Sequence, residues 1–244
     1  MTETLWHGFR AAEFEFEGRY AILVFPEKAD GAKNWMLKTE YFGAFPQREI
    51  DLVNRGLHLA YLKNENRFAT EADCRRKARF ADYLHEHFGL RDRCLPVGMS
   101  LGGAHAMNFA GFFPEKVVGL FLDAPVLNFM SYPGDYRSWD CRAVWDQEFV
   151  QAYPGITRGQ LLHFPNHPIG KLPVLLAHRI PILMLWGTQD ATVDYENNGR
   201  LLELEYDPAL LTVIPREAQG HHPHGDVRDP EAVIEKLLQF CREA

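Results

Sequence analysis

The chain has 244 residues and a mass of 28.1 kDa, and 46% of its residues are hydrophobic while 24% are charged. This composition is ordinary for a folded globular protein and excludes a disordered, collagen-like or low-complexity chain. The 26 Lys and Arg residues against 33 Asp and Glu give a formal net charge of −7. That charge argues against a general nucleic-acid binder and favours a protein that acts on small or neutral ligands.

The N-terminus and the cysteines favour the cytoplasm as the compartment of this protein. The first ten residues contain no basic segment followed by an apolar one, so no signal peptide is expected, and apolar stretches such as Ile180–Trp186 are too short to span a membrane. Cys74, Cys94, Cys141 and Cys241 are scattered without a Cys-x-x-Cys pair, which favours reduced thiols. We expect a cytoplasmic protein with no membrane or nucleic-acid partner. The sequence leaves open whether the protein forms a homodimer.

The first half of the chain alternates short apolar runs with amphipathic stretches, which is typical of βαβ units and a largely parallel sheet. Ala12–Gly18 alternates polar and apolar residues and predicts an edge strand, antiparallel to the next one. The apolar runs Tyr20–Phe25 and Gly56–Leu62 predict buried strands. A helix is predicted between Thr70, which can cap its first turn, and Gly89, which can end it.

The second half continues this pattern with one interruption. The further predicted elements are a strand at Arg93–Val97, a helix at Ala104–Phe113, strands at Val117–Leu122, Ile180–Trp186 and Leu210–Ile214, and a last helix from Asp229 to Arg242. Residues 127–172 are rich in proline and aromatic side chains and show little periodicity. A structureless loop of this length is uncommon in a compact domain. The sequence therefore predicts a single domain over residues 1–244, with a cap of short helices inserted at about 127–172.

A candidate nucleophile lies between a predicted strand and a predicted helix. Gly98–Gly102 fits the pattern G-x-S-x-G, in which a sharp turn holds the serine in a strained backbone conformation and the glycines prevent clashes. Five residues of this kind recur by chance, and a simple glycine-rich turn is the alternative interpretation. The strand that ends at Val97 and the helix that follows supply the context that favours Ser100 as a nucleophile.

A serine hydroxyl needs a base, and the base needs an orienting acid. Asp190 follows the strand Ile180–Trp186, and His221 follows the strand Leu210–Ile214. Both therefore fall at the carboxyl ends of strands, where the ligand sites of α/β proteins gather. The sequence predicts that Ser100 attacks, that His221 accepts its proton, and that Asp190 orients the imidazole.

Two alternatives accompany this assignment. Asp123 also ends a strand and could supply the acid, but Asp190 is preferred because it lies one strand–helix unit before His221. The neighbouring His222 and His224 are expected to bond the loop or to line the pocket. A histidine-rich run can also bind zinc, but no cysteine or second histidine cluster completes a ligand set, so no metal is predicted.

Gly98–Gly103, Gly187–Asp190 and Gly220–His221, in this order, resemble the α/β-hydrolase family over essentially the whole chain. A narrower resemblance to a bacterial subgroup of that family rests on Trp35, Glu40–Gly43, Asp123–Val126, Glu196–Asn197 and Gly220–His224. The resemblance implies an α/β fold whose mostly parallel sheet has about eight strands, a Ser–His–Asp triad and no cofactor. Family members include esterases, lipases, peptidases, lactonases, haloalkane dehalogenases and non-catalytic relatives. The dehalogenases use aspartate where this chain has serine.

The oxyanion hole is expected from backbone N–H groups. One donor is assigned to Met99, beside the nucleophile, and the other to Glu27 or Lys28 in the loop after the strand Tyr20–Phe25. That loop lacks the His-Gly or Gly-Gly pair that many esterases carry.

Four side chains are candidate substrate contacts. Glu40 either returns towards the site or lies on a surface helix, and His222 is expected in the pocket. Trp139 and Trp145 either flank the substrate or pack the cap onto the body. The resulting prediction is a serine hydrolase that cleaves a small-molecule carboxylic ester through an acyl-enzyme. The alternatives are an acyltransferase or peptidase with the same triad, or a non-catalytic binding protein on the same fold.

Overall fold

The computed structural model describes residues 1–135 and 139–243, with all side chains in these ranges except those of Trp139 and Asp140. Its centre is a nine-stranded sheet in the order β1-β2-β3-β5-β4-β6-β7-β8-β9. The strands are β1 (Thr2–Trp6), β2 (Phe9–Phe16), β3 (Arg19–Val24), β4 (Trp35–Lys38), β5 (His58–Leu62), β6 (Leu95–Met99), β7 (Leu120–Asp123), β8 (Ile182–Gly187) and β9 (Leu211–Arg216). The strands β1, β2, β3 and β5 pair antiparallel in turn, and those from β5 to β9 run parallel. The predicted α/β fold with a mostly parallel sheet is confirmed.

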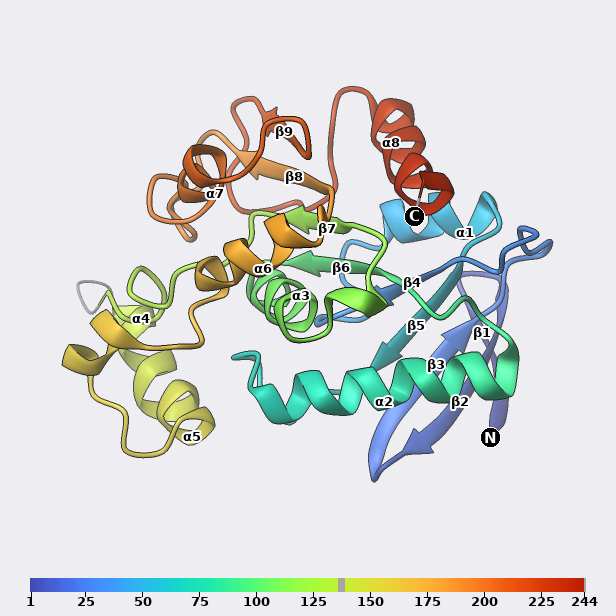
Figure 1. The fold of residues 1–244 in the computed structure, drawn as a ribbon, viewed down its shortest axis with the longest axis horizontal. Helices are drawn as coiled ribbons and strands as arrows, with labels where there is room; N and C mark the ends of the chain where they lie inside the picture. Colours follow the sequence, from blue (N-terminus) through green and yellow to red (C-terminus); the bar gives the residue numbers. More distant parts are fainter. Residues whose placement is uncertain (136–138, 244) are drawn as a thin grey trace.

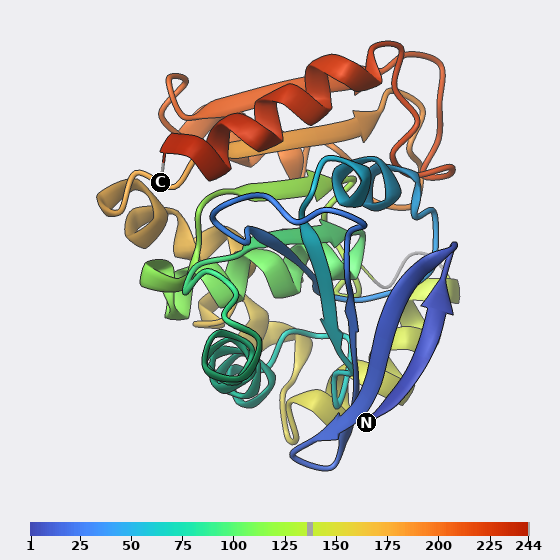
Figure 2. The ribbon, with the colours of Figure 1, turned by 90° about the vertical axis from the view of Figure 1, so that its right-hand side faces the viewer.

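Helices cover both faces of the sheet (Figures 1 and 2). The helices are α1 (Gln47–Asn54), α2 (Glu71–Phe88), α3 (Leu101–Phe112), α4 (Trp139–Val144), α5 (Val150–Ala152), α6 (Leu172–Ala177), α7 (Gly199–Glu205) and α8 (Pro230–Glu243). One buried cluster joins one face of the sheet to α1 and α8, and a second joins the other face to α2, α3, α6 and α7. The central strands are therefore buried on both sides, as expected for parallel strands in an α/β protein.

The strand β4 is a short element that the sequence analysis did not predict. Trp35 and Leu37 point into the cluster of α2 and α3, whereas Met36 points into that of α1 and α8. Such alternation is the period of a strand, because successive side chains leave opposite faces. Only four residues carry this pattern, which is too short a run to distinguish from a loop by sequence.

Two other expectations at the N-terminal end have different outcomes. The helix between Thr70 and Gly89 is confirmed as α2, with the Thr70 hydroxyl accepting a hydrogen bond from the N–H of Asp73 and Gly89 in the left-handed conformation at φ 65°. The strand predicted at Ala12–Gly18 corresponds to β2, but it is not the edge, because β1 lies outside it. The alternation of β1 is concealed in the sequence because Thr2 and Thr4 share a face with the buried Trp6, while the apolar Leu5 is exposed.

The segment after β7 folds into short helices at the carboxyl ends of the parallel strands, at the lower left of Figure 1. Besides α4 and α5 it contains a π-helical turn at Trp145–Phe149 and 3₁₀ turns at Arg158–His163 and Pro168–Lys171. A third buried cluster packs this segment onto the first turn of α3, through Phe129 and Phe149 against Leu101. Of the described helices, none is long and apolar enough to cross a membrane.

Candidate active site

Ser100 lies on the sharp turn between β6 and α3. Its backbone is in a left-handed conformation, with φ 53° and ψ −125°, and its N–H donates to the Asp123 carbonyl at 3.0 Å. A Cβ added at Gly98 would lie 2.4 Å from the Gly102 carbonyl oxygen, and one at Gly103 would lie 2.3 Å from Cβ of Pro125. These glycines are needed because the chain passes over itself at this turn. The strained serine is thus held by its surroundings at the end of the strand.

His221 and Asp190 complete a chain of hydrogen bonds that begins at Ser100. The Nε2 atom of His221 is 3.1 Å from Oγ of Ser100, and its Nδ1 atom is 2.7 Å from Oδ2 of Asp190. The side chains of His221 and Asp190 are only 7% and 2% exposed. The structure therefore brings together all three residues that the sequence proposed, in the order that proton transfer from serine to histidine requires.

The loops that carry the acid and the base are bonded to each other. The N–H of Gln189 donates to the carbonyl of Gln219 at 2.8 Å, and the N–H of Ala218 donates to the Thr188 hydroxyl at 2.9 Å. A Cβ at Gly187 would lie 2.2 Å from the carbonyl oxygen of Gly220, so only glycine allows the loops to approach this closely. The separation of acid and base is therefore fixed by backbone contacts.

Asp190 is held as a carboxylate. Its Oδ1 atom accepts hydrogen bonds from the N–H groups of Thr192 and Val193, each at 2.9 Å. Burial works to raise the pKa of Asp190, but the hydrogen bonds from His221 and from these backbone groups outweigh it and lower the pKa. The negative charge beside Nδ1 of His221 can therefore stabilise an imidazolium.

Asp123 lies at the end of β7 but is adjacent to a different histidine. One of its oxygens is 3.3 Å from Nδ1 of His224 and 3.2 Å from the Arg216 guanidinium, and the other accepts a hydrogen bond from the N–H of Gly225. Burial works to raise the pKa of Asp123, but His224, Arg216 and the Gly225 N–H together lower it. Asp123 is thus a buried carboxylate with its own cation and does not contact His221.

Arg216 connects this buried carboxylate to the loop of the catalytic histidine. Its guanidinium is 0% exposed and donates to the carbonyl of Pro223, and it lies 3.5 Å from the carbonyl of His221. Together Asp123 and Arg216 hold backbone groups on both sides of His222. We call this pair the loop clamp. Sequence reasoning missed Arg216, because an arginine at a strand end gives no signal until its buried partner is known.

The oxyanion donors differ from those expected. Met99 precedes Ser100 and ends β6, whereas the residue that follows the serine is Leu101, the first residue of α3. Glu27 and Lys28 follow β3, which is antiparallel to β5, so they lie at the opposite edge of the sheet from Ser100. Both expectations are therefore wrong. Glu27 and Lys28 were chosen because β4 was not identified, so the loop was assigned to the wrong strand, whereas Met99 lies on the wrong side of the serine.

The loop after β4 is the one that reaches the nucleophile. A Cβ at Gly102 would lie 3.5 Å from the backbone nitrogen of Glu40, so this loop packs against the first turn of α3. The Thr39 N–H is already used, because it donates to Val97 at 3.1 Å. Tyr41 follows in the left-handed region at φ 55°. The N–H groups of Leu101 and of the Glu40–Tyr41 backbone are thus candidate donors for an oxyanion.

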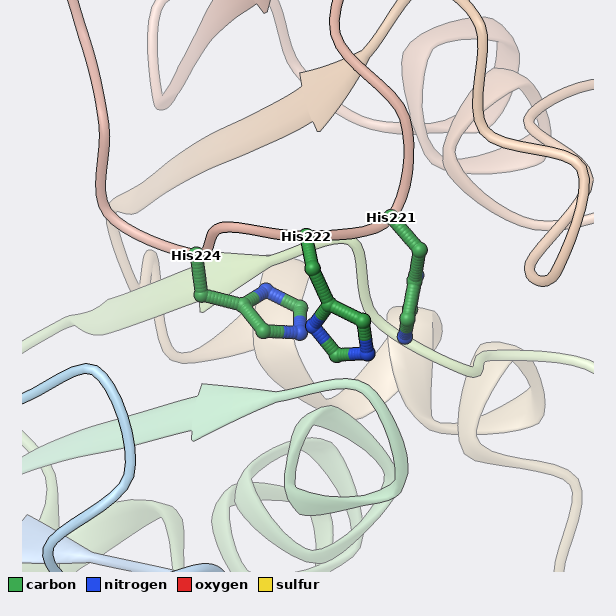
Figure 3. Close-up of side chains that lie close together, drawn as sticks. All are labelled: His221, His222 and His224. Atoms are coloured by element: carbon green, nitrogen blue, oxygen red, sulfur yellow. The ribbon is translucent and has the colours of Figure 1, made fainter.

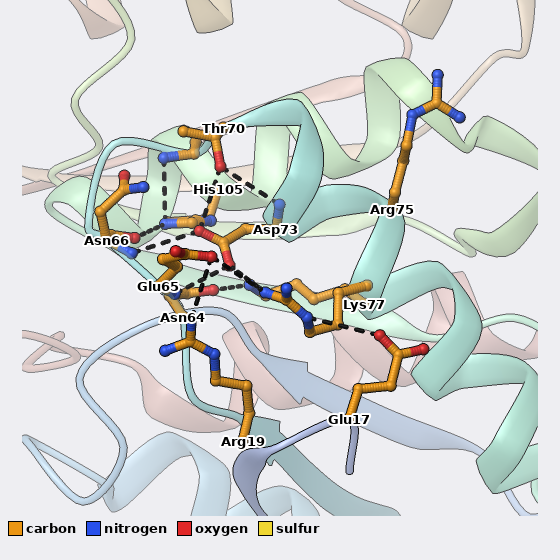
Figure 4. Close-up of polar contacts among 12 residues, drawn as sticks. Glu17, Arg19, Asn64, Glu65, Asn66, Thr70, Asp73, Arg75, Lys77 and His105 are labelled. Carbon is orange, nitrogen blue, oxygen red and sulfur yellow. Dashed lines mark hydrogen bonds and ion pairs between the residues drawn. The ribbon is translucent and has the colours of Figure 1, made fainter. Parts of the chain in front are cut away.

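A buried polar network that includes Asn64 and Lys77 lies at the start of α2 (Figure 4). Asn64 donates through its amide to the Thr39 carbonyl at 2.7 Å and to the Glu40 carboxylate, and its amide oxygen accepts from the buried Lys77. Glu40 therefore lies beside the nucleophile at the end of β4 and not on a surface helix. Its expected contact with substrate stays a prediction.

The remaining candidate substrate residues occupy different surroundings. Trp145 is 4% exposed and stacks on Phe149 at 4.9 Å, so it packs the cap instead of lying beside a substrate. The side chain of Trp139 lies outside the described part of the chain. His222 is exposed and stacks on Phe45 at 5.2 Å. Burial, together with the positive charges that His221 and His224 can carry, lowers the pKa of His222.

A cavity of about 700 Å³ lies between the cap and the loop of the acid. Its wall includes Thr192, whose N–H donates to Asp190, so it adjoins the acid side of the triad. Its other polar walls include Asn128, Ser131, Asp135, Arg158, Asp194 and Asn197. A volume of this size is typical of a small-molecule site.

Comparison with known proteins gives the fold but no near relative. No family model and no curated protein matches the chain. Among solved structures, the S-formylglutathione hydrolase of Agrobacterium tumefaciens is 15% identical, with a TM-score of 0.65 over 100% of this chain and 98% of that one. The fluorophosphonate-binding serine hydrolase F of Staphylococcus aureus is 14% identical, with a TM-score of 0.63 over 94% and 96%. A chain from Bacteroides ovatus designated a dipeptidyl aminopeptidase IV is 12% identical with a TM-score of 0.66, and this chain covers only 35% of its length.

Proposed function

We propose that this chain, which has the α/β-hydrolase fold, is a serine hydrolase that cleaves a carboxylic ester through an acyl-enzyme. The observation that carries the proposal is the continuous contact from Ser100 Oγ to His221 Nε2 at 3.1 Å and from His221 Nδ1 to Asp190 Oδ2 at 2.7 Å. A purely binding protein has no need for this ordered set of three groups.

In the first half of the reaction, Oγ of Ser100 attacks the ester carbonyl while Nε2 of His221 accepts the hydroxyl proton. Asp190 holds the Nδ1–H bond and stabilises the imidazolium. The carbonyl oxygen becomes an oxyanion, whose binding we assign to the N–H of Leu101 and to an N–H of the loop after β4. Loss of one such donor typically costs about 2.7–4 kcal/mol of transition-state stabilisation.

In the second half, the tetrahedral intermediate breaks its bond to the alcohol oxygen, and the alcohol leaves with the proton from His221. Water then attacks the acyl group on Ser100, with His221 again accepting a proton and returning it to the serine oxygen as the acid is released. No cofactor enters either step.

The cavity has a mixed wall. It carries two amides, two hydroxyls, a guanidinium and two carboxylates, at Asn128, Asn197, Ser131, Thr192, Arg158, Asp135 and Asp194, and it is apolar at Met130, Leu161 and Ala191. The polar groups can fix the orientation of a ligand by hydrogen bonds, and the apolar residues can bury part of it. We therefore propose a small ester that carries a polar group beside a short apolar acyl part.

The test combines a fluorophosphonate probe with a series of p-nitrophenyl esters of increasing acyl length. We expect the wild type to be labelled and to turn over the short members, and Ser100→Ala to lose labelling and turnover while keeping its circular dichroism spectrum. Labelling without turnover would instead favour an acyltransferase or a peptidase with the same triad. Absence of both from the folded wild type would favour a binding protein and overturn the proposal.

A further inference from the structure

Three histidine side chains of the loop after β9 converge beside the triad. His221, His222 and His224 turn towards the same side of the loop (Figure 3). One ring nitrogen from each lies within 4.8 Å of the others, and the ring centroids are 4.7–5.0 Å apart. Only His221 has a place in the proposed reaction, so the function leaves the convergence of the other two unexplained.

Two of these imidazoles lie beside carboxylates, and one of them, that of His221, is hydrogen-bonded in the way that metal-binding histidines are. Nδ1 of His221 faces Asp190 at 2.7 Å, and Nδ1 of His224 faces Asp123 at 3.3 Å. A carboxylate on one ring nitrogen fixes the ring and directs the other nitrogen towards a metal ion, an arrangement common around zinc. The two carboxylates lie at the ends of the neighbouring strands β7 and β8, and both histidines lie in the loop after β9, so the two rings lie at the same edge of the sheet.

The third imidazole has the freedom to complete the set. A zinc–nitrogen bond of about 2.0–2.1 Å in tetrahedral geometry separates the ligand nitrogens by about 3.4 Å, which is less than the spread seen here. His222 is exposed, and rotation of its side chain can close the difference. His221 and His224 are only 8% and 6% exposed, so the exposed His222 gives an ion its path from solvent.

We propose that His221, His222 and His224 bind a divalent transition-metal ion such as Zn²⁺, and that the bound ion inhibits the enzyme by occupying the Nε2 lone pair of His221. That lone pair is the one that must accept the proton of Ser100, whose Oγ lies 3.1 Å away. Coordination and catalysis therefore exclude each other. The binding part stands on the histidine cluster alone, whereas the inhibitory part rests on the proposed function.

The experiment titrates ZnCl₂ into the purified full chain by calorimetry. We expect one ion per chain, with a Kd that is raised at least tenfold in His222→Gln and in His224→Gln. The exposed His178, remote from the triad, gives the matched control His178→Gln, which should bind as the wild type does. Because His222 is exposed, its variant tests the site even if His224→Gln fails to fold. Unchanged affinity in His222→Gln, or no binding at one equivalent, would overturn the site.

A second measurement separates the two proposals. Zinc at a concentration above its Kd should slow fluorophosphonate labelling of the wild type at least tenfold, and a chelator should restore the rate. If zinc binds at the histidines but labelling is unaffected, the inhibitory part is wrong. If the wild type is not labelled even without zinc, the proposed hydrolase function fails, and the calorimetric result still decides whether the metal site exists.

Discussion

The molecule contains two acid–histidine pairs whose acids lie at neighbouring strand ends. The pairs differ in how each carboxylate is neutralised. Asp190 after β8 contacts His221 at 2.7 Å, and its other oxygen accepts from two backbone N–H groups. Asp123 at the end of β7 lies 3.3 Å from His224 but is also paired with the buried Arg216. The charge of Asp190 can thus stabilise a developing imidazolium, whereas that of Asp123 is already paired with Arg216 in the loop clamp. Similar residues at adjacent positions can therefore serve proton transfer in one case and loop position in the other.

The largest expected difference in kcat is between substitutions of His221 and of His224. His221→Gln should lower kcat by about 10⁶-fold, because His221 is the one side chain, within the described ranges, that contacts the Ser100 hydroxyl to accept its proton. His224→Gln should lower it by about 10- to 100-fold, the size of effect produced by groups that orient a functional side chain. Turnover of a p-nitrophenyl ester measures both. Equal losses in two folded variants would contradict the division of roles.

The two acids give the next largest contrast. Asp190→Asn should lower kcat by about 10⁴-fold, as the corresponding change does in a serine protease, because the imidazole is left in the wrong tautomer. Asp123→Asn should act mainly on the free energy of unfolding. Steady-state kinetics and urea denaturation of both variants distinguish these effects. A ranking in which Asp123→Asn lost more activity would assign the acid to β7.

Loss of the loop clamp should lower the free energy of unfolding. Arg216→Met leaves the Asp123 carboxylate buried without its cation and should lower the free energy of unfolding by about 3–5 kcal/mol. Adding Asp123→Asn to it should recover part of this loss, because the uncompensated charge is then removed. The exposed pair of Arg200 and Glu203 gives the control Arg200→Met, with an expected loss of about 1 kcal/mol or less. Urea unfolding that found equal losses for the two arginine variants would argue against a clamp.

Acid should weaken the clamp only below the ordinary pKa of a carboxyl group. The pKa of Asp123 is lowered in the folded protein by His224, Arg216 and the Gly225 N–H, which outweigh its burial. Its stabilising contribution is therefore complete above the unfolded pKa of about 3.9 and decreases as the pH falls from there towards the folded pKa. The wild type should lose its advantage over Asp123→Asn by about 1.4 kcal/mol per pH unit in that window. Urea unfolding between pH 6 and pH 3 measures this, and a constant difference would show that the carboxylate has an ordinary pKa.

The parts of the fold that the sequence predicted are those with a strong local signal. The helix α2 has a capping threonine and a terminal glycine, and the turn at Ser100 has glycines at fixed spacing between a strand and a helix. The triad residues lie at ends of long apolar strands, so their meeting at one edge of the sheet follows from the parallel topology.

The parts that were not predicted depend on partners distant in sequence. The strand β4 is four residues long and is stabilised by pairing with both β5 and β6. Without it, the oxyanion loop was placed after β3, at the wrong edge of the sheet. The pairing of Arg216 with Asp123 joins residues that only the assembled sheet brings together. Trp145 became a packing residue because Phe149 and the first turn of α3 cover it.

The distance along the chain between the reacting groups has a consequence for how activity arises during folding. Ser100 and His221 are 121 residues apart, and the histidine follows β9, the last strand at the end of the sheet. Closing so long a loop is entropically unfavourable until the intervening strands have docked. In a refolding experiment, helix signal can therefore return while the serine is still unreactive. Reactivity towards fluorophosphonate should appear only when β9 joins the sheet. The rate at which it appears would therefore report when this last strand pairs with β8.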